Sequence, residues 1–346
     1  MNADRNDRFA THESHAAAAE EAFLLNESAA VVLDGAGRSF ADIHAVRDLS
    51  LRVEPGSVLG VIGPSGAGKT TSIRLMTGGL APTAGAVRVL GEDPRRFRRQ
   101  TREQIGYLPQ QFTLYPYLTA QENVGFIASI YGLLWFRHGR RVREVLELVE
   151  LWDVRNRLAA RMSGGMQRRL ELAATLVHDP AVLLLDEPTA GIDPILRASV
   201  WEELHRLKAA GRTLIVTTQY VNEAEECDQV ALISGGRLIA FASPEELRRE
   251  AVGGHAIEVE TDAPFDASEL SGQSGVTRIV QTGPRTFQAV VDDAGTATPA
   301  VLEAIVARGA SVKSSREFVP SFDDVFATLV ERHSPDNGDA NDAEVA

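Results

Sequence analysis

Residues 63–71 form a glycine-rich segment that ends in a lysine and two threonines, a composition suited to binding phosphate. The run Gly-Pro-Ser-Gly-Ala-Gly-Lys-Thr matches the pattern G-x-x-x-x-G-K-[ST], in which glycines let backbone N–H groups curl around phosphate oxygens. Lys69 would neutralise the β and γ oxygens, and Thr70 would bind Mg²⁺. An ordinary glycine turn is the alternative, but the segment lies between an apolar run and a helical stretch, where a helix dipole also favours an anion. The predicted residues of this phosphate loop are Gly63, Pro64, Ser65, Gly66, Ala67, Gly68, Lys69, Thr70 and Thr71.

A continuous apolar run at residues 181–185 is followed directly by two acids, Asp186 and Glu187. This pattern is typical of a fully buried parallel strand that delivers side chains to its carboxyl end. Asp186 could hold a metal through water, and Glu187 could act as the general base that polarises an attacking water. Taken alone, the run could be any exit from a strand, and the upstream phosphate loop is what favours chemistry.

Residues 163–167, which we call the signature segment, open a predicted helix that ends before Asp179 and Pro180. Ser163 is expected to cap this helix, and a Ser-Gly-Gly start leaves free N–H groups that could bind phosphate. On these residues alone an ordinary capped helix is about as good an interpretation.

The elements that would position these residues alternate along the chain, as short apolar strands and helices from Val31 onward. This alternation predicts an α/β sheet. Residues 111–165 show helical patterns without an obvious strand, so we expect a helical insert there.

A separate C-terminal accessory domain is expected at residues 253–332, because the pattern there changes to β-α-β-β-α-β, which resembles a ferredoxin-like unit. The expected strands are 255–261, 276–281, 286–292 and 311–319, and the expected helices are 267–270, 298–307 and 323–332. Residues 1–28 are interpreted as a disordered leader and residues 333–346 as a disordered acidic tail.

Composition limits the classes of function. The chain of 346 residues has 35 Lys+Arg against 48 Asp+Glu, a net charge of −13, so no nucleic acid is expected as a partner. The single cysteine, Cys227, excludes an internal disulfide and favours the reducing cytoplasm. The longest uncharged apolar stretch, at residues 124–136, is shorter than the roughly 18–20 residues needed to cross a bilayer.

The order of these motifs resembles the nucleotide-binding subunit of an ATP-binding cassette (ABC) transporter. The phosphate loop, Gln110, the signature segment, the Asp186–Glu187 pair and Asp193 follow in the family's order between about residues 30 and 245. The resemblance implies a P-loop NTPase of ABC type at residues 29–250, with a mixed sheet core and a helical subdomain at about 111–165. It also implies hydrolysis of ATP with Mg²⁺ and a nucleotide-driven dimer, formed with a second copy or with another cassette.

Several roles follow only from this resemblance. Phe40 would stack on adenine or else pack under the sheet, and Gln110 would join the metal and the water to the helical lobe. Asp193 would act across the dimer interface, although Asp193-Pro194 is also a strong N-cap. The residues implied to contact the partner subunit's nucleotide are Ser163, Gly164, Gly165, Met166 and Gln167. Those implied to hold the metal are Thr70, Gln110 and Asp186.

Gln219 departs from the family pattern, which usually has histidine after the strand at residues 213–218. A glutamine amide can donate and accept a hydrogen bond but cannot carry a proton or a charge. We therefore expect an active ATPase in which Gln219 stands in for the histidine without its pH response. The alternative is a switch module that binds ATP and closes but hydrolyses it weakly.

The end of the chain refines the expected class. The segment Pro-Ser-Phe-Asp-Asp-Val-Phe at 320–326 resembles the C-terminal region of exporter ATPases that serve type-2 permeases, including the daunorubicin-resistance type. This resemblance favours a subunit at the cytoplasmic face of the membrane that drives a separate permease to export a hydrophobic or amphipathic compound. The accessory domain could regulate the enzyme or only support the dimer. The apolar patch of Tyr115, Tyr117 and residues 124–136 could contact the permease or form the core of the helical lobe.

Overall fold

The computed structural model describes residues 29–333. The predicted leader and nearly all of the predicted acidic tail lie outside these residues. The chain divides into two compact units between Phe241 and Ala242, and each unit is described by itself.

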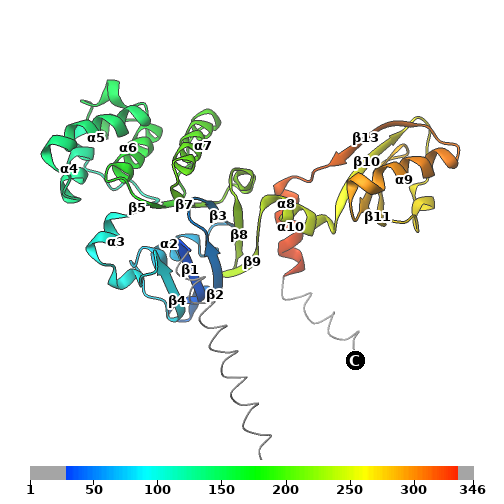
Figure 1. The fold of residues 1–346 in the computed structure, drawn as a ribbon, viewed down its shortest axis with the longest axis horizontal. Coiled ribbons are helices and arrows are strands. Elements are labelled where there is room, and N and C mark those ends of the chain that lie inside the picture. Colours follow the sequence, from blue (N-terminus) through cyan, green and yellow to red (C-terminus); the bar gives the residue numbers. More distant parts are fainter. Residues whose placement is uncertain (1–28, 334–346) are drawn as a thin grey trace, which may run out of the picture. The chain divides into compact units, whose positions relative to one another are not determined.

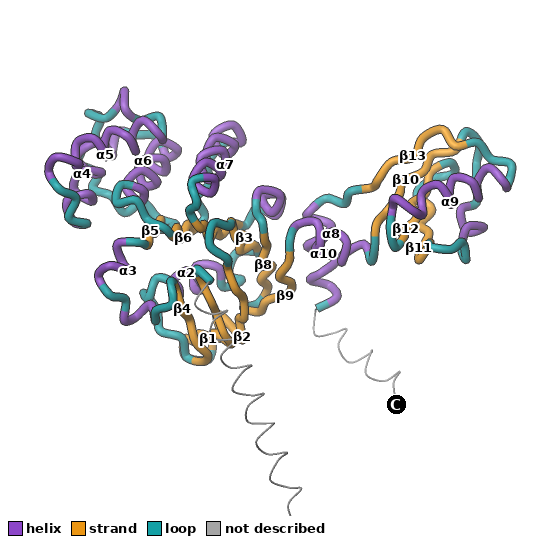
Figure 2. The backbone as a smooth tube through the Cα atoms, viewed as in Figure 1, coloured by secondary structure: helices purple, strands orange, loops and turns teal. Residues whose placement is uncertain are grey.

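A six-stranded sheet runs through the first unit (Figures 1 and 2). Its order is β5 (Ile105–Leu108), β6 (Val182–Asp186), β7 (Thr213–Thr218), β3 (Val58–Ile62), β8 (Gln229–Ser234) and β9 (Arg237–Ala242). The strands from β5 to β8 are parallel, and every residue of β3, β6 and β7 is buried, as their apolar runs predict. In this register Asp186 lies opposite Thr217 and Ile62 opposite Thr218, so the carboxyl ends of three strands meet at one edge.

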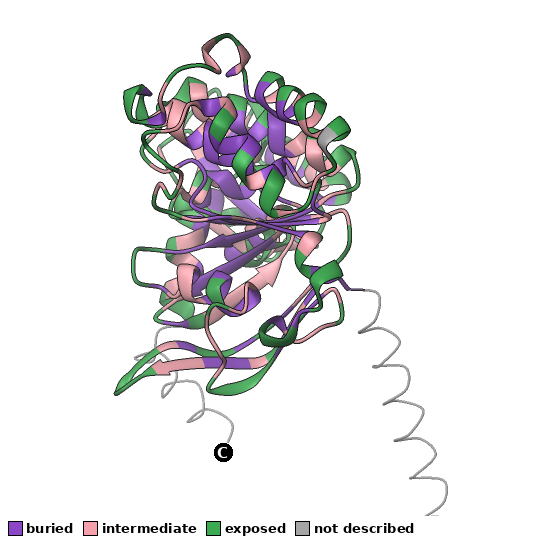
Figure 3. Ribbon diagram, turned by 90° about the vertical axis from the view of Figure 1, so that its left-hand side faces the viewer, coloured by how far each residue is buried: buried purple, intermediate pink, exposed green. Residues whose placement is uncertain are grey.

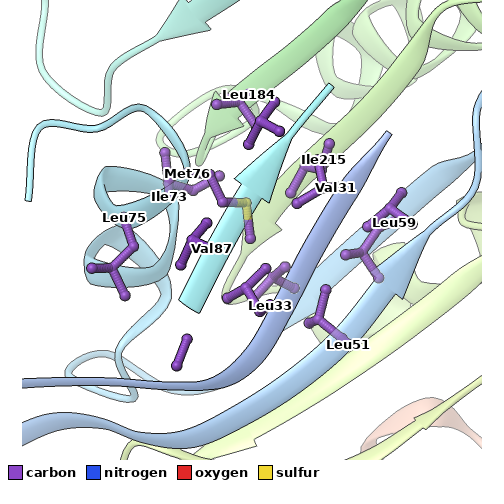
Figure 4. Packing of buried hydrophobic residues seen from close by; sticks show 14 of the residues in the cluster. Val31, Leu33, Leu51, Leu59, Ile73, Leu75, Met76, Val87, Leu184 and Ile215 are labelled. Atoms are coloured by element: carbon purple, nitrogen blue, oxygen red, sulfur yellow. The ribbon is translucent and has the colours of Figure 1, made fainter. Parts of the chain in front are cut away.

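A second, antiparallel sheet in the same unit has the order β2 (Ile43–Val53), β1 (Val31–Phe40) and β4 (Ala84–Val89). Helix α2 (Lys69–Met76) contacts β2 and β4 as well as β6 and β7 of the larger sheet. Figure 4 shows side chains from both sheets and α2 in one core, among them Leu33, Met76 and Leu184. This core fixes the start of α2, and with it the phosphate loop.

Helices of the first unit cover the other face of the large sheet (Figure 1). They are α4 (Ala120–Ile130), α5 (Trp135–Leu148), α6 (Gly164–Leu176) and α7 (Pro194–Ala209), whereas the short helix α3 (Arg99–Glu103) lies on the same side of the sheet as α2. Single 3-10 segments occur at Pro94–Arg96, Trp152–Val154, Ala159–Arg161 and Val221–Glu226. Helices α4, α5 and α6 pack on one another, so the helical lobe continues past residue 165 through α6. In Figure 3 the central strands are buried, while the helices show exposed outer faces.

The second unit contains a four-stranded antiparallel sheet with the order β11 (Val276–Gln281), β12 (Thr286–Val291), β10 (His255–Thr261) and β13 (Val312–Phe318). One helix, α9 (Ala294–Ala307), packs on this sheet, and Phe287 and Val301 lie in the core between them. The predicted β-α-β-β-α-β order is present. The helix expected at 267–270 is present with these bounds, as the 3-10 helix Ala267–Leu270, the form that short helical segments of three or four residues commonly take.

The boundary between the units differs from the one expected near residues 250–253. Helix α8 (Pro244–Val252) packs against α10 (Phe322–Arg332) of the second unit, with Leu247 and Leu329 fully buried. Arg332 donates hydrogen bonds to the carbonyl oxygens of Glu250 (2.8 Å) and Ala251 (2.9 Å). The structure therefore assigns α8 to the second unit, since its apolar face needs a helix that follows much later in the chain.

Candidate functional site

The phosphate loop connects β3 to α2 in a conformation that only glycine permits at two positions. A Cβ atom on Gly63 would lie 2.1 Å from the Ile233 carbonyl oxygen, and one on Gly68, at φ +106°, would lie 2.5 Å from that of Ala45. The buried Lys69 side chain donates from Nζ to the carbonyl oxygens of Gly63 (2.8 Å) and Pro64 (3.1 Å). The Lys69 ammonium is therefore held at the phosphate loop, where it is predicted to neutralise phosphate oxygens.

Asp186 lies at the end of β6, fully buried. Its Oδ1 accepts hydrogen bonds from the hydroxyls of Thr70 (3.1 Å) and Thr217 (2.7 Å). Its Oδ2 is buried and has no hydrogen-bond partner in the described part of the chain. Sequence reasoning missed Thr217, although a threonine near the carboxyl end of a strand next to the predicted site is the signal that could have indicated it.

Glu187 follows in a left-handed backbone conformation, with φ +50°. Its Oε1 lies 3.4 Å from Lys69 Nζ, and its Oε2 accepts a hydrogen bond of 2.9 Å from Nε2 of Gln110. Its backbone N–H donates to the carbonyl oxygen (3.1 Å) and hydroxyl (3.0 Å) of Thr217. The structure thus brings Lys69, Gln110, Asp186 and Glu187 together at one edge of the sheet.

Gln219 is exposed directly after β7, and its Oε1 accepts a hydrogen bond of 3.4 Å from Ser65 Oγ. This contact places Gln219 beside the phosphate loop. Phe40 is 42% exposed at the β1–β2 turn, with the guanidinium of Arg38 4.6 Å above its ring. Its aromatic face is thus a surface feature rather than part of the core.

The signature segment opens α6. Ser163 Oγ accepts a hydrogen bond from Met166 N (3.3 Å), which is the predicted cap. Gln167 Nε2 donates to the Ala159 carbonyl oxygen (3.0 Å), and a Cβ atom on Gly165 would lie 2.3 Å from a methyl group of Leu196 on α7. A Cβ atom on Gly164 would meet nothing within 4 Å, so the helix tip has open space in front of it.

Asp193 caps α7: its Oδ1 accepts hydrogen bonds from Ile195 N (3.1 Å) and Leu196 N (3.0 Å), with Pro194 as the first helical residue. The capping interpretation therefore holds, and the exposed position of Asp193 leaves a role at an interface open.

The donor set at the strand ends fits Mg²⁺. Mg²⁺ usually takes one or two carboxylates, with phosphate oxygens and water completing the shell. Asp186 offers a buried carboxylate oxygen without a partner, and Thr70 offers a hydroxyl at the same place. Residues 29–333 contain no group of three or more His, Cys, Asp and Glu side chains that could hold a metal ion.

Comparison with known proteins identifies the family. The family model "ABC transporter" matches residues 46–190, and the model "ATP-binding protein DrrA1-3-like, C-terminal domain" matches residues 243–330. The daunorubicin resistance ATP-binding protein DrrA3 of Streptomyces coeruleorubidus is 38% identical over 304 residues, which span 87% of this chain and 95% of that protein. The chain belongs to the ATP-binding proteins of ABC transporters. It is an ABC-type ATPase with a DrrA-like C-terminal domain.

Other relatives of this ABC ATPase agree. The Nod factor export ATP-binding protein I of Rhizobium sp. (strain N33) is 36% identical over 308 residues, which span 88% of this chain and 97% of that protein. Among solved structures, the ATP-binding cassette MJ0796, a dimer in a post-hydrolysis state bound to ADP and Pi, is 26% identical with a TM-score of 0.57. That match covers 62% of this chain and 98% of the cassette, and confirms the predicted P-loop fold. Within the described residues, no helix is long and apolar enough to cross a membrane.

Proposed function

We propose that this ABC ATPase hydrolyses MgATP to drive a separate membrane permease that exports a hydrophobic or amphipathic compound. The observation that carries the proposal is the Glu187 carboxylate, held between Lys69 Nζ and the Gln110 amide at the end of β6. A carboxylate positioned from both sides beside a phosphate loop is suited to orient an attacking water.

The nucleotide would bind at the phosphate loop, whose backbone N–H groups and Lys69 hold its phosphates. Phe40 is proposed to stack on the adenine ring. Mg²⁺, when bound through Thr70, Asp186 and Gln110, would neutralise charge on the β and γ phosphates.

Glu187 is proposed as the general base: one carboxylate oxygen accepts a proton from water as the oxygen of that water attacks the γ phosphorus, and the bond from this phosphorus to the oxygen of the β phosphate breaks to release ADP and phosphate. The Gln110 amide fixes the orientation of Oε2, and Lys69 balances the charge next to Oε1. Gln219 is proposed to contact the γ phosphate from the side of Ser65, with which it already shares a hydrogen bond.

The active form is proposed to be a dimer, formed with a second copy or with another cassette. In this dimer residues 163–167 of one subunit would cover the nucleotide held by the other, since open space lies in front of Gly164. Asp193 would lie at the same interface.

Contact with the permease is proposed through apolar residues of the helical lobe. Tyr115 (50% exposed), Tyr117 (85%) and Phe126 (41%) lie at the surface after the Gln110 loop, and the rings of Tyr115 and Phe126 pack edge to face at 5.1 Å. Val124 and Ala128 are fully buried instead. The predicted apolar patch thus has two faces, a core face and a face free to bind a permease segment at the membrane surface.

Export, rather than import, is supported by the likeness to DrrA3 and the Nod factor export protein.

The test is the substitution Glu187→Gln, which keeps the side-chain size and removes the proton acceptor. We expect the variant to bind MgATP, to lose roughly 10²–10⁴-fold in turnover, and to accumulate as an ATP-bound dimer. Phosphate release and light scattering with ATP measure these effects. Glu202→Gln, an exposed glutamate on α7, is the matched control. Unchanged turnover in Glu187→Gln would remove the assignment of the base.

A further inference from the structure

Arg168 is a buried arginine that joins the signature helix to the site. It lies on α6, one turn after Gly164, and is 9% exposed. Its guanidinium donates to the backbone carbonyl oxygens of Asp186 (2.6 Å), Glu187 (3.0 Å), Pro188 (3.2 Å) and Pro109 (2.6 Å). Three of these four carbonyls belong to the turn that carries both carboxylates, and the fourth precedes Gln110.

The backbone turn that Arg168 holds is strained. Glu187 adopts φ +50°, a left-handed conformation that is unfavourable for a non-glycine residue and persists only where its neighbours over-determine it. Thr217 accepts a hydrogen bond from the backbone N–H of Glu187, while Arg168 donates to the carbonyl oxygens of Asp186 and of Glu187 itself. The direction of the Glu187 side chain therefore depends on both residues.

Arg168 and its partner Glu171 also hold the loop that carries Gln110, at one point before this residue and one point after it. Arg168 holds the Pro109 carbonyl and also pairs with Glu171 (Nη1 to Oε2, 3.0 Å). Glu171 in turn accepts a hydrogen bond from Thr113 N (2.9 Å) through its Oε1. The loop is thus tied to α6 before and after Gln110, the residue that contacts Glu187 Oε2.

We propose that Arg168 is a positioning residue for hydrolysis, which holds the Asp186–Glu187 turn and the Gln110 loop in their reactive arrangement with the signature helix. This inference rests on the proposed role of Glu187 as the base. It adds a link within one subunit between the helix whose tip would meet the partner subunit's nucleotide and the carboxylate that would act on its own.

Stability alone does not account for this arrangement. Burial lowers the pKa of Arg168 and raises the pKa of Glu171, so both charges are held against a cost of desolvation. Replacing a buried ion pair by apolar side chains of similar size is often neutral or stabilising. A planar guanidinium is, however, the side chain that can serve several carbonyl groups at once in a fixed geometry, and lysine cannot replace it in that role.

The test compares Arg168→Met with the double variant Arg168→Met/Glu171→Leu, which leaves no unpaired buried charge, and with Arg168→Lys. A misplacement of about 1 Å can cost about 10²-fold in rate, so kcat is expected to fall roughly tenfold or more in the first two variants. Arg168→Lys should fall between them and the wild type. The Kd for a fluorescent ATP analogue measured without Mg²⁺ should stay within about twofold of wild type, because neither side chain contacts the phosphate loop. Arg169→Met is the matched control, since Arg169 lies on the same helix but donates to Val149 and Glu150.

The proposal is overturned if a folded double variant keeps kcat within about twofold of wild type. It is also overturned if kcat and nucleotide affinity fall together in proportion to thermal stability, as a structural role predicts. Glu187→Gln measured in parallel separates the two proposals. If that variant retains turnover, the base assignment fails; if it loses turnover while the Arg168 variants retain it, only the positioning role fails.

Discussion

Asp186 and Glu187 are adjacent in the sequence, but their carboxylates have different neighbours. Asp186 faces two hydroxyls, from Thr70 and Thr217, whereas Glu187 faces the ammonium of Lys69 and the amide of Gln110. The left-handed backbone at Glu187 turns its side chain away from the direction that a continuing strand would give. One residue is thereby suited to a metal and the next to a water.

The first prediction at this scale concerns Gln219. Because glutamine does not titrate, we expect kcat of the wild type to show no inflection due to position 219 between about pH 6 and 8. Gln219→His should remain active and acquire an inflection near the ordinary histidine pKa of about 6.5. Steady-state phosphate release across this pH range measures it, with Ser65→Ala as a control that removes only the hydroxyl hydrogen-bonded to Gln219. Absence of turnover in the wild type, restored in Gln219→His, would favour the switch-module alternative.

At the scale of elements, the two ends of α6 contact different parts of the first unit. Its first two turns present the signature segment and Arg168, and just beyond its last turn His178 lies against the start of β5. The His178 ring stacks on Tyr131 after α4 at 3.7 Å, and its Nε2 hydrogen-bonds the Ile105 carbonyl oxygen of β5 at 3.1 Å. Since a carbonyl only accepts, Nε2 carries the proton, and the buried Nδ1 has no hydrogen-bond partner in the described structure.

This geometry predicts a dependence of stability on pH. Burial lowers the pKa of His178 below its ordinary value of about 6.5. The unfolded chain therefore binds more protons here than the folded one as the pH falls below about 6.5, so the free energy of unfolding should decrease with acidification through this window. His178→Phe keeps the stack on Tyr131 and should reduce this decrease, as denaturant titrations at pH 7 and 5.5 would measure. His205→Gln, which removes a half-buried histidine on α7 away from the Tyr131 stack, is the control, and an equal slope in both variants would contradict the assignment.

At the scale of the whole chain, the two units have separate cores. The first core gathers side chains from two sheets and α2, while the second lies between the four-stranded sheet and α9. All predicted site residues belong to the first unit. The α8–α10 pair belongs to the second, where the Arg248 guanidinium lies 4.6 Å above the ring of the buried Phe322.

The corresponding prediction is that Phe322→Ala destabilises the second unit without affecting nucleotide binding. Removing this buried ring should cost about 3–5 kcal/mol. Hydrogen exchange should then increase over residues 242–333, while the Kd for ATP with Mg²⁺ stays unchanged. Val306→Ala, at a 62% exposed position on α9, is the control. A matching loss of ATP affinity would show that the two units are energetically coupled.

Much of this could be predicted from the sequence, because the signals are local. The bounds of β7, β10 and β11 follow from short segments rich in β-branched and apolar residues, and the caps of α6 and α7 follow from Ser163 and Asp193. The boundary expected after α8 rather than before it has a different origin. The helix that packs on α8 follows about seventy residues later in the chain, so no local pattern could assign α8 to the second unit.

By itself the sequence determined the family, the phosphate loop and the two acids. Each depends on short contiguous patterns of residue types, whose chemistry can be recognised without a tertiary structure. Only the tertiary structure decided that Thr217 shares Asp186 with Thr70, that Gln110 reaches Glu187, and that Arg168 holds the turn between them. These contacts join segments that lie far apart in the chain. Their geometry follows from the register of parallel strands and the packing of α6 on β5, which no local pattern encodes.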